Sequence, residues 1–236
     1  MKRRDFGQYC GLARALELVG ERWALLIIRD LAGRPQRYTD LFEGLPGIPT
    51  NMLSTRLKEL EQAGLVERRI APAPQRGVLY DLTPAGHSLE PAIIALGRWG
   101  AGLLDAKPRP GDVLPPASVT MTLRAVFDAE AAAGLTATWE IHAADMVLYA
   151  AVTDGRLEAG VGPAPVDPDL VITFEPEPDD LPSYRSLIRA IKCGLVKVEG
   201  RRTLLDTFLR VFAPPQDAQV ETSRTPPMGA TADGTV

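Results

Sequence analysis

The stretch that decides the fold is PTNMLSTRLKELEQAG, which runs from Pro49 to Gly64. Three leucines in it recur at i, i+4 and i+7, the spacing of one buried face of an α-helix: Leu53, Leu57 and Leu60. Proline suits the first position of a helix, and glycine suits the position that follows its last turn. The segment therefore predicts a helix from Pro49 to Gln62 that packs one apolar face against a core.

The opposite face of this helix is polar. Asn51, Thr55 and Lys58 lie roughly opposite the leucines, and Ser54 flanks them. Such a face presents hydroxyl, amide and ammonium groups, which can pair with base edges and phosphates. In an isolated amphipathic helix, an ordinary solvated face would be the more common explanation. The neighbouring segments decide between the two readings.

Those neighbours predict a winged helix-turn-helix. Apolar residues at helical spacing indicate helices over 12–19 and 23–31, and a short third helix begins at Tyr38 with Thr39 as its expected N-cap. A turn over 43–48 leads into the fourth helix. After Gly64, segments 65–70 and 78–82 read as a hairpin whose tip presents Arg76, followed by a long helix from Thr83 to about Leu104.

In this arrangement the fourth helix suits the major groove of double-stranded DNA, and the hairpin is the wing. Arginines around the third helix and the wing lie where a duplex backbone would pass. For Arg56 a structural ion pair is as good an explanation as a phosphate contact, because its direction on the helix is close to the buried side. The predicted DNA-binding residues are Arg37, Thr50, Asn51, Ser54, Thr55, Arg56, Lys58, Arg69 and Arg76.

Charge is unevenly distributed along the 236 residues, whose net charge is -4. Residues 1–107 hold 15 Lys and Arg against 12 Asp and Glu, whereas residues 108–236 hold 11 against 18. A mildly basic front half and an acidic rear half permit a DNA-binding domain joined to a domain with another role. The chain shows no apolar run of about 20 residues and no signal peptide at its start, so we expect a cytoplasmic protein without a membrane partner.

Chemistry-bearing residues are sparse. Cys10 and Cys193 form no CxxC or Cys/His cluster, so we expect reduced thiols, no disulfide, no metal site and no cofactor. The histidines are His87 and His142, and no serine or cysteine stands in a recognisable nucleophile motif. The sequence therefore predicts that the protein is not an enzyme.

The chain divides at a proline-rich stretch. Residues 107–116 carry a composition that resists both helix and strand, so we predict domains at 1–106 and 117–213 joined by this linker. Residues 214–236 are rich in Thr, Pro, Ala and Gly, with little to bury, and are predicted to be disordered.

Residues 8–103 resemble the HxlR family of bacterial winged-helix regulators, relatives of the MarR group. The resemblance is carried by Cys10 with GLARALELVG (11–20), and by RWALLIIR (22–29), RYTDL (37–41), MLSTRLKEL (52–60), AGLVER (63–68) and YDLTPAG (80–86). It implies a homodimer, joined through terminal helices, on a near-palindromic operator. Family members usually have Cys-Pro at the N-terminal cysteine, whereas Gly11 follows Cys10 here. For Cys10 a packed residue and a redox sensor both remain open.

The rear half resembles the sterol carrier protein fold through LRAVFDAEAAAG (123–134), YAAVTDG (149–155), PDLVIT (168–173) and GLVKVEG (194–200). Its pattern predicts strands over 136–142, 146–153, 156–161, 170–174 and 196–199, and helices over 181–193 and 201–212. The resemblance implies an apolar ligand cavity, and a solid core is the alternative. Predicted ligand-binding residues are Trp139, Val147, Tyr149, Ile172, Leu187, Ile191, Leu205 and Phe208.

Together these features predict a multidomain α+β protein: a winged helix-turn-helix followed by a sterol-carrier-like sheet domain. The predicted function is that of a homodimeric, sequence-specific transcriptional regulator, for example a repressor, whose operator affinity responds to an apolar small molecule. A carrier of lipids or apolar metabolites, with the front half as a dimerising adaptor, is the main alternative. A catalytic rear domain is a further one.

Overall fold

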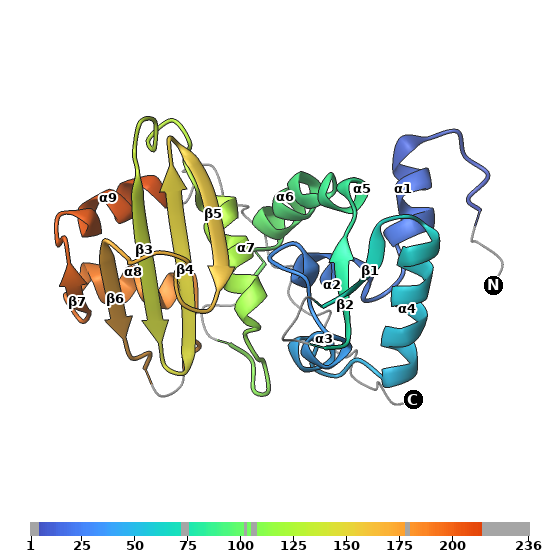
Figure 1. Cartoon of the computed structure of the whole chain (residues 1–236), viewed down its shortest axis with the longest axis horizontal. Helices are drawn as coiled ribbons and strands as arrows, with labels where there is room; N and C mark the ends of the chain where they lie inside the picture. Colours follow the sequence, from blue (N-terminus) through green and yellow to red (C-terminus); the bar gives the residue numbers. More distant parts are fainter. Residues whose placement is uncertain (1–4, 72–75, 102, 105–107, 178–179, 214–236) are drawn as a thin grey trace, which may run out of the picture.

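The protein consists of a helical part and a sheet part, with a helix lying between them (Figure 1). The computed structural model describes residues 5–71, 76–101, 103–104, 108–177 and 180–213. Residues 214–236, predicted to be disordered, lie outside the described residues, as does residue 107 of the predicted linker.

The helical part has the element order of a winged helix-turn-helix. Its elements are α1 (Gly11–Val19), α2 (Ala24–Leu31), α3 (Tyr38–Gly44), α4 (Thr50–Gln62), β1 (Val66–Ile70), β2 (Val78–Leu82), α5 (Pro84–His87) and α6 (Glu90–Ala101). Strands β1 and β2 pair antiparallel as a two-stranded wing. Leucines of α4 pack into a core with Ile27, Ile28 and Leu31 of α2.

The sheet part is an α+β unit. Its elements are α7 (Pro116–Val126), β3 (Ala137–Ala143), β4 (Met146–Thr153), β5 (Arg156–Val161), β6 (Leu170–Phe174), α8 (Tyr184–Lys192), β7 (Lys197–Gly200) and α9 (Leu204–Val211). The described strands form one mixed sheet in the order β5-β4-β3-β6-β7, in which β3 and β6 run parallel and the other neighbours antiparallel. Its identity as a sterol-carrier-like domain remains a prediction.

Helix α7, for which the sequence pattern assigned no element, belongs to both parts. Val119 and Leu123 lie in the core of the sheet part, whereas Met121 lies in the core of the helical part. Side chains two residues apart on a helix point in nearly opposite directions, because each residue turns the chain by about 100°. Helix α7 therefore contributes to both cores at once, and the domain boundary near residue 117 stays a prediction.

Several predicted helix boundaries differ from the structure: the helices predicted over 181–193 and 201–212 are shorter, as α8 and α9, and α3, α4 and the helix after the wing also differ. Helix α3 begins at Tyr38 with Arg37, not Thr39, as N-cap, because the Asp40 carboxylate accepts a hydrogen bond from the Arg37 amide at 3.1 Å. Pro49 is the N-cap of α4 instead of its first residue. The long helix predicted from Thr83 is split into α5 and α6, because Pro91 has no amide hydrogen and its ring excludes the carbonyl of residue i−4 from helical geometry.

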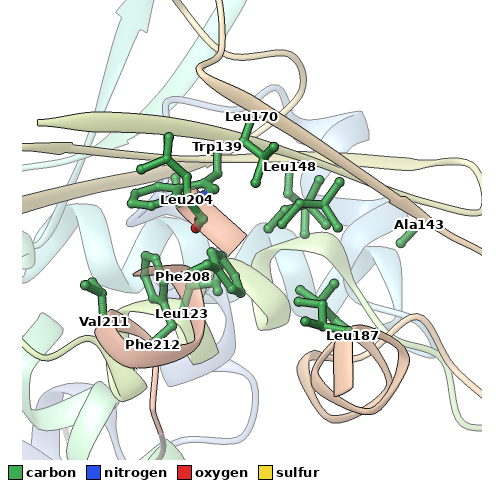
Figure 2. Packing of buried hydrophobic residues seen from close by; sticks show 14 of the residues in the cluster. Leu123, Trp139, Ala143, Leu148, Leu170, Leu187, Leu204, Phe208, Val211 and Phe212 are labelled. Atoms are coloured by element: carbon green, nitrogen blue, oxygen red, sulfur yellow. Dashed lines mark hydrogen bonds between the residues drawn. The ribbon is translucent and has the colours of Figure 1, made fainter. Parts of the chain in front are cut away.

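Aromatic side chains pack against one another in the core of the sheet part, among aliphatic ones (Figure 2). Trp139 of β3 is fully buried and packs edge-to-face against Phe208 and Phe212, with ring centroids 5.9 Å away in each case. Its indole Nε1 donates a hydrogen bond to the Leu204 carbonyl at 3.1 Å, so its one polar atom is satisfied. These contacts fasten α9 to the sheet.

A buried carboxylate lies beneath the turn between α3 and α4. Asp30, at the end of α2, is 2% exposed and pairs through Oδ1 with the Arg29 guanidinium at 2.7 Å. Its other oxygen, Oδ2, has no hydrogen-bond partner among the described residues and faces Gly44, where an added Cβ would lie 3.2 Å away. Burial raises the pKa of Asp30 from about 3.8 to about 6, although Arg29 opposes the shift.

The packing of Phe208 gives a test of whether the sheet part is solid. Replacement of a fully buried phenylalanine by alanine removes its burial energy and leaves a cavity, which costs about 3 to 5 kcal/mol. We therefore expect Phe208→Ala to lower the free energy of unfolding by that amount in chemical denaturation. The exposed Leu195→Ala is the matched control and should change it by less than about 0.5 kcal/mol. A small loss for Phe208→Ala would show that this core contains spare space.

The Asp30 carboxylate predicts a specific pH dependence. Its pKa is higher in the folded protein than in the unfolded chain, so its contribution to stability is fully present below about pH 3.8 and is lost as the pH rises through 6. The side-chain amide of the Asp30→Asn variant cannot ionise. Between pH 4 and 7, the unfolding free energy of the native chain relative to this variant should fall by about 2 to 3 kcal/mol.

Urea denaturation across this pH range measures the difference, and Asp145→Asn, at an exposed turn, is the control. Parallel pH profiles for the native chain and Asp30→Asn would contradict the assignment.

Candidate DNA interface

Helix α4 presents the predicted polar face to the surface. Asn51, Ser54 and Lys58 are exposed and Thr55 is half-buried, whereas the three leucines of the other face are at most 1% exposed. Thr50 is exposed at the first turn. Among the described residues, none forms a hydrogen bond or ion pair with the Asn51 side-chain amide or the Lys58 ammonium. Both groups are therefore available to a ligand that approaches this face.

The hydroxyls on α4 are pre-oriented by the protein. Ser54 Oγ donates to the Thr50 carbonyl at 3.0 Å, and Thr55 Oγ1 donates to the Asn51 carbonyl at 2.8 Å. Tyr38 of α3 donates its hydroxyl to the Thr50 carbonyl at 2.8 Å and lies 3.2 Å from Ser54 Oγ. This tyrosine ties α3 to the first turn of α4, although the sequence pattern did not assign it to the site. Its position at the start of α3, in the string RYTDL, was the available signal.

Arg56 does not belong to the exposed face, which corrects its assignment as a DNA-binding residue. It is 6% exposed, and its guanidinium forms ion pairs with Glu59 and, at 3.2 Å, with Glu21. Its Nε donates to the Arg22 carbonyl at 3.2 Å. These partners use the donors of Arg56 to join α4 to the segment before α2, so its role is structural.

The wing is held against α3 by Arg37. Its Nη1 donates to the Arg76 carbonyl at 2.7 Å, and the guanidinium lies so close to Gly77 that an added Cβ there would meet Nη1 at 2.6 Å. The Gln36 backbone also pairs with Tyr80 of β2, because the amide of each residue donates a hydrogen bond to the carbonyl of the other. Arg37 thus uses one of its side-chain donors to bind the wing backbone. The Arg76 side chain itself is exposed.

Arg69 is exposed but paired. Its guanidinium contacts Glu67 at 2.5 Å and Asp81 at 2.8 Å. The hydrogen bond with Glu67 and the charge of Asp81 raise the pKa of Arg69, so it stays charged. Two carboxylates that balance one guanidinium weaken its attraction for a phosphate. Arg69 is therefore a weaker candidate for DNA contact than Arg76 or Lys58.

The predicted ligand-binding residues do not surround one cavity. The strand register pairs Trp139 with Ala150 and Ile141 with Ile172, which places Trp139 and Ile172 on the face that packs against the helices. Val147 and Tyr149 alternate with the buried residues of β4 and lie on the opposite face, which corrects their assignment to the same site. On that face Tyr149 covers Gly160 and donates to Glu158 at 3.0 Å.

The remaining ligand-binding candidates are parts of the packed core. Leu187, Ile191 and Phe208 are at most 7% exposed and contact the core cluster, against which Leu205 packs while half-buried. Two clefts between the helical part and its neighbouring segments are lined by other residues. Whether this core opens for a ligand stays a prediction.

The remaining candidate site residues are the two cysteines. Cys10, the N-cap residue of α1, and Cys193 are exposed free thiols. Within the described ranges, no three His, Cys, Asp or Glu side chains gather as a metal site would require. No helix in the described part is both long and apolar enough to span a bilayer. A redox role for Cys10 stays a prediction.

Comparison with known proteins agrees with this architecture. A sequence model of the HxlR-like helix-turn-helix matches residues 18–108. The transcriptional regulator YodB of Bacillus subtilis is 38% identical over 100 residues, which cover 42% of this chain and 86% of that one. The regulator YvaP of the same organism is 33% identical over 92 residues, or 39% of this chain and 85% of that one.

Among solved structures, a MarR-family regulator from Porphyromonas gingivalis is 33% identical, with 44% of this chain and all of that chain covered and a TM-score of 0.38. On the sequence matches and the helix-turn-helix described above, this chain belongs to the HxlR-like helix-turn-helix family of transcriptional regulators.

Proposed function

We propose that the protein is a homodimeric, sequence-specific regulator that inserts α4 into the major groove of a near-palindromic operator. The observation that carries the proposal is the exposed polar face of α4, on which Asn51 and Lys58 have no partner among the described residues. Thirteen helical residues span about 20 Å, enough to cross a major groove about 12 Å wide. Arg76 of the wing would contact the phosphate backbone beside it.

Exposed apolar side chains on the terminal helices support the dimer. Leu96, Trp99 and Leu103 follow one another along one face of α6 and its C-terminal end, and Trp99 is 57% exposed. On α1, Leu12 and Leu16 are exposed as well. Apolar residues that recur at helical spacing on a surface suit an interface, and a second copy of the chain offers the same stripes. In such a dimer the two α4 helices would read half-sites about 10 base pairs apart.

The sheet part is proposed as the regulatory half, which responds to a small molecule with an apolar body. Helix α7 connects it to the DNA-binding half, so a ligand that favours one arrangement of the two would change operator affinity. As a transcriptional regulator, the protein would act in the cytoplasm and would not catalyse a reaction. A carrier with a dimerising adaptor, the alternative function, would show no sequence-specific affinity for DNA.

Substitution at Asn51 tests the groove assignment. A side-chain amide that makes a bidentate contact with a base contributes about 1 to 3 kcal/mol of discrimination. Asn51→Ala should therefore cost about that much per half-site on the selected operator and little on random DNA, measured by fluorescence anisotropy. Gln62→Ala, at the far end of α4, is the control and should leave both affinities unchanged. Equal losses on both kinds of DNA for Asn51→Ala would refute base recognition by this residue.

A charge placed in the apolar stripe tests the dimer. Trp99→Glu should convert a dimer at micromolar concentration into a monomer, because each copy would bury an unpaired carboxylate at the interface. Analytical ultracentrifugation gives the molecular mass directly. Leu195→Glu, which alters an exposed leucine of the sheet part, should remain dimeric. A native chain that is monomeric would refute the dimer, and a Trp99→Glu variant that is still dimeric would place the interface elsewhere.

A further inference from the structure

A cleft of about 400 Å³ lies where the helical part meets the sheet part. Its walls come from the end of α2, from α6, from α7 and from β5, and Figure 1 shows α7 between the two parts. Its lining combines apolar residues, Ile94, Phe127 and Leu157, with charged residues, Glu90, Arg124 and Glu158. Any molecule bound here touches both halves of the protein.

Arg124 is already occupied by the protein. Its Nη1 lies 3.0 Å from the Glu90 carboxylate and 3.3 Å from the Ala32 carbonyl, and its Nη2 donates to the Ala159 carbonyl at 3.0 Å. The charges of Arg124 and Glu90 therefore balance each other, and most donors of the guanidinium are used. An anionic ligand would have to displace Glu90 from this pair.

Glu158 gives the cleft its remaining charge. It is exposed, and its partner among the described residues is the Tyr149 hydroxyl at 3.0 Å. Burial and the neighbouring Glu158 raise the pKa of Tyr149, so this partner is a neutral phenol and does not balance the carboxylate. The residues that line the cleft therefore carry one more negative than positive charge, beside three apolar side chains.

We propose that this cleft binds a small organic cation with an apolar body, whose ammonium group pairs with Glu158 while its body lies on Ile94, Phe127 and Leu157. The aromatic ring of Phe127 adds a surface that favours a cation. The effect of this ligand on DNA rests on the proposed regulator function, whereas its binding does not. The cleft is an alternative to the core of the sheet part as the ligand site.

The position of the cleft explains how such a ligand would act on DNA binding. Ala32, which lines it, directly follows α2 and precedes the segment that leads to α3. Ile94 belongs to α6, which carries the apolar stripe of the proposed dimer interface. A ligand that binds the two arrangements of these elements unequally changes operator affinity, and operator DNA must then change ligand affinity by the same factor.

Three probes with one apolar body and different head groups test the charge preference: 4-tert-butylbenzylamine, the corresponding benzyl alcohol and 4-tert-butylbenzoate. Isothermal titration of the full chain without DNA should show the amine bound about 3- to 20-fold more tightly than the alcohol, from one exposed ion pair and one cation–π contact. The benzoate should bind least. Equal affinities for amine and alcohol, or a preference for the benzoate, would overturn the proposal.

Two variants connect this preference to Glu158. Glu158→Gln should remove the preference for the amine, and Glu158→Lys should reverse it toward the benzoate, a reversal that loss of folding would not produce. Glu130→Gln, an exposed carboxylate of the same part, is the control and should behave as the native chain. An unchanged amine preference in Glu158→Gln would refute the site.

Repetition of the titration with saturating operator separates this proposal from the regulator function. Amine binding that depends on Glu158 in a protein that binds no operator would uphold the site and refute the regulator. Operator binding without any binding of the amine would uphold the regulator and refute the site. Binding of both with no mutual effect on affinity would show that the site does not regulate DNA binding.

Discussion

The arrangement of the whole molecule depends on the burial of two opposite faces of α7. Val119 and Leu123 complete the core of the sheet part, and Met121 completes the core of the helical part. A helix with apolar residues on both sides is stable only between two partners. Two arginines reinforce the junction: Arg124 bonds to α6 and β5, and Arg98 of α6 donates to the Ala125 carbonyl at 3.1 Å. The parts are therefore built around a shared helix.

This junction lies close to the elements that would touch DNA. Arg124 reaches the Ala32 carbonyl at the end of α2, where Asp30 lies beneath the turn that leads into α4. The Asp30 carbonyl accepts a hydrogen bond from Gln36 at 2.5 Å, and the Gln36 backbone pairs with the wing. Contacts thus run from the sheet part to the end of α3 and to the wing. They offer a physical route for regulation, and coupling measurements decide whether it is used.

The sequence predicted the bounds of the strands better than it predicted which residues contact one another in the folded chain. Strands 146–153, 156–161 and 170–174 agree with the structure to the residue, because alternating apolar side chains and turn residues are local signals. Arg56 was ambiguous because its burial depends on Glu21, 35 positions away. Val147 and Tyr149 were grouped with Trp139 because strand register, which decides the face, is a property of the assembled sheet.

Helix α7 was missed because its two apolar faces lack the single stripe of an ordinary surface helix, although Val119, Met121 and Leu123 were visible in the chain.

The central claim, that α4 reads DNA, is tested most directly by selection of bound sequences from a random DNA pool with the purified full-length protein. The account predicts enrichment of a near-palindrome with half-sites about 10 base pairs apart. Selected sequences without a shared motif, or retention of no DNA, would contradict it.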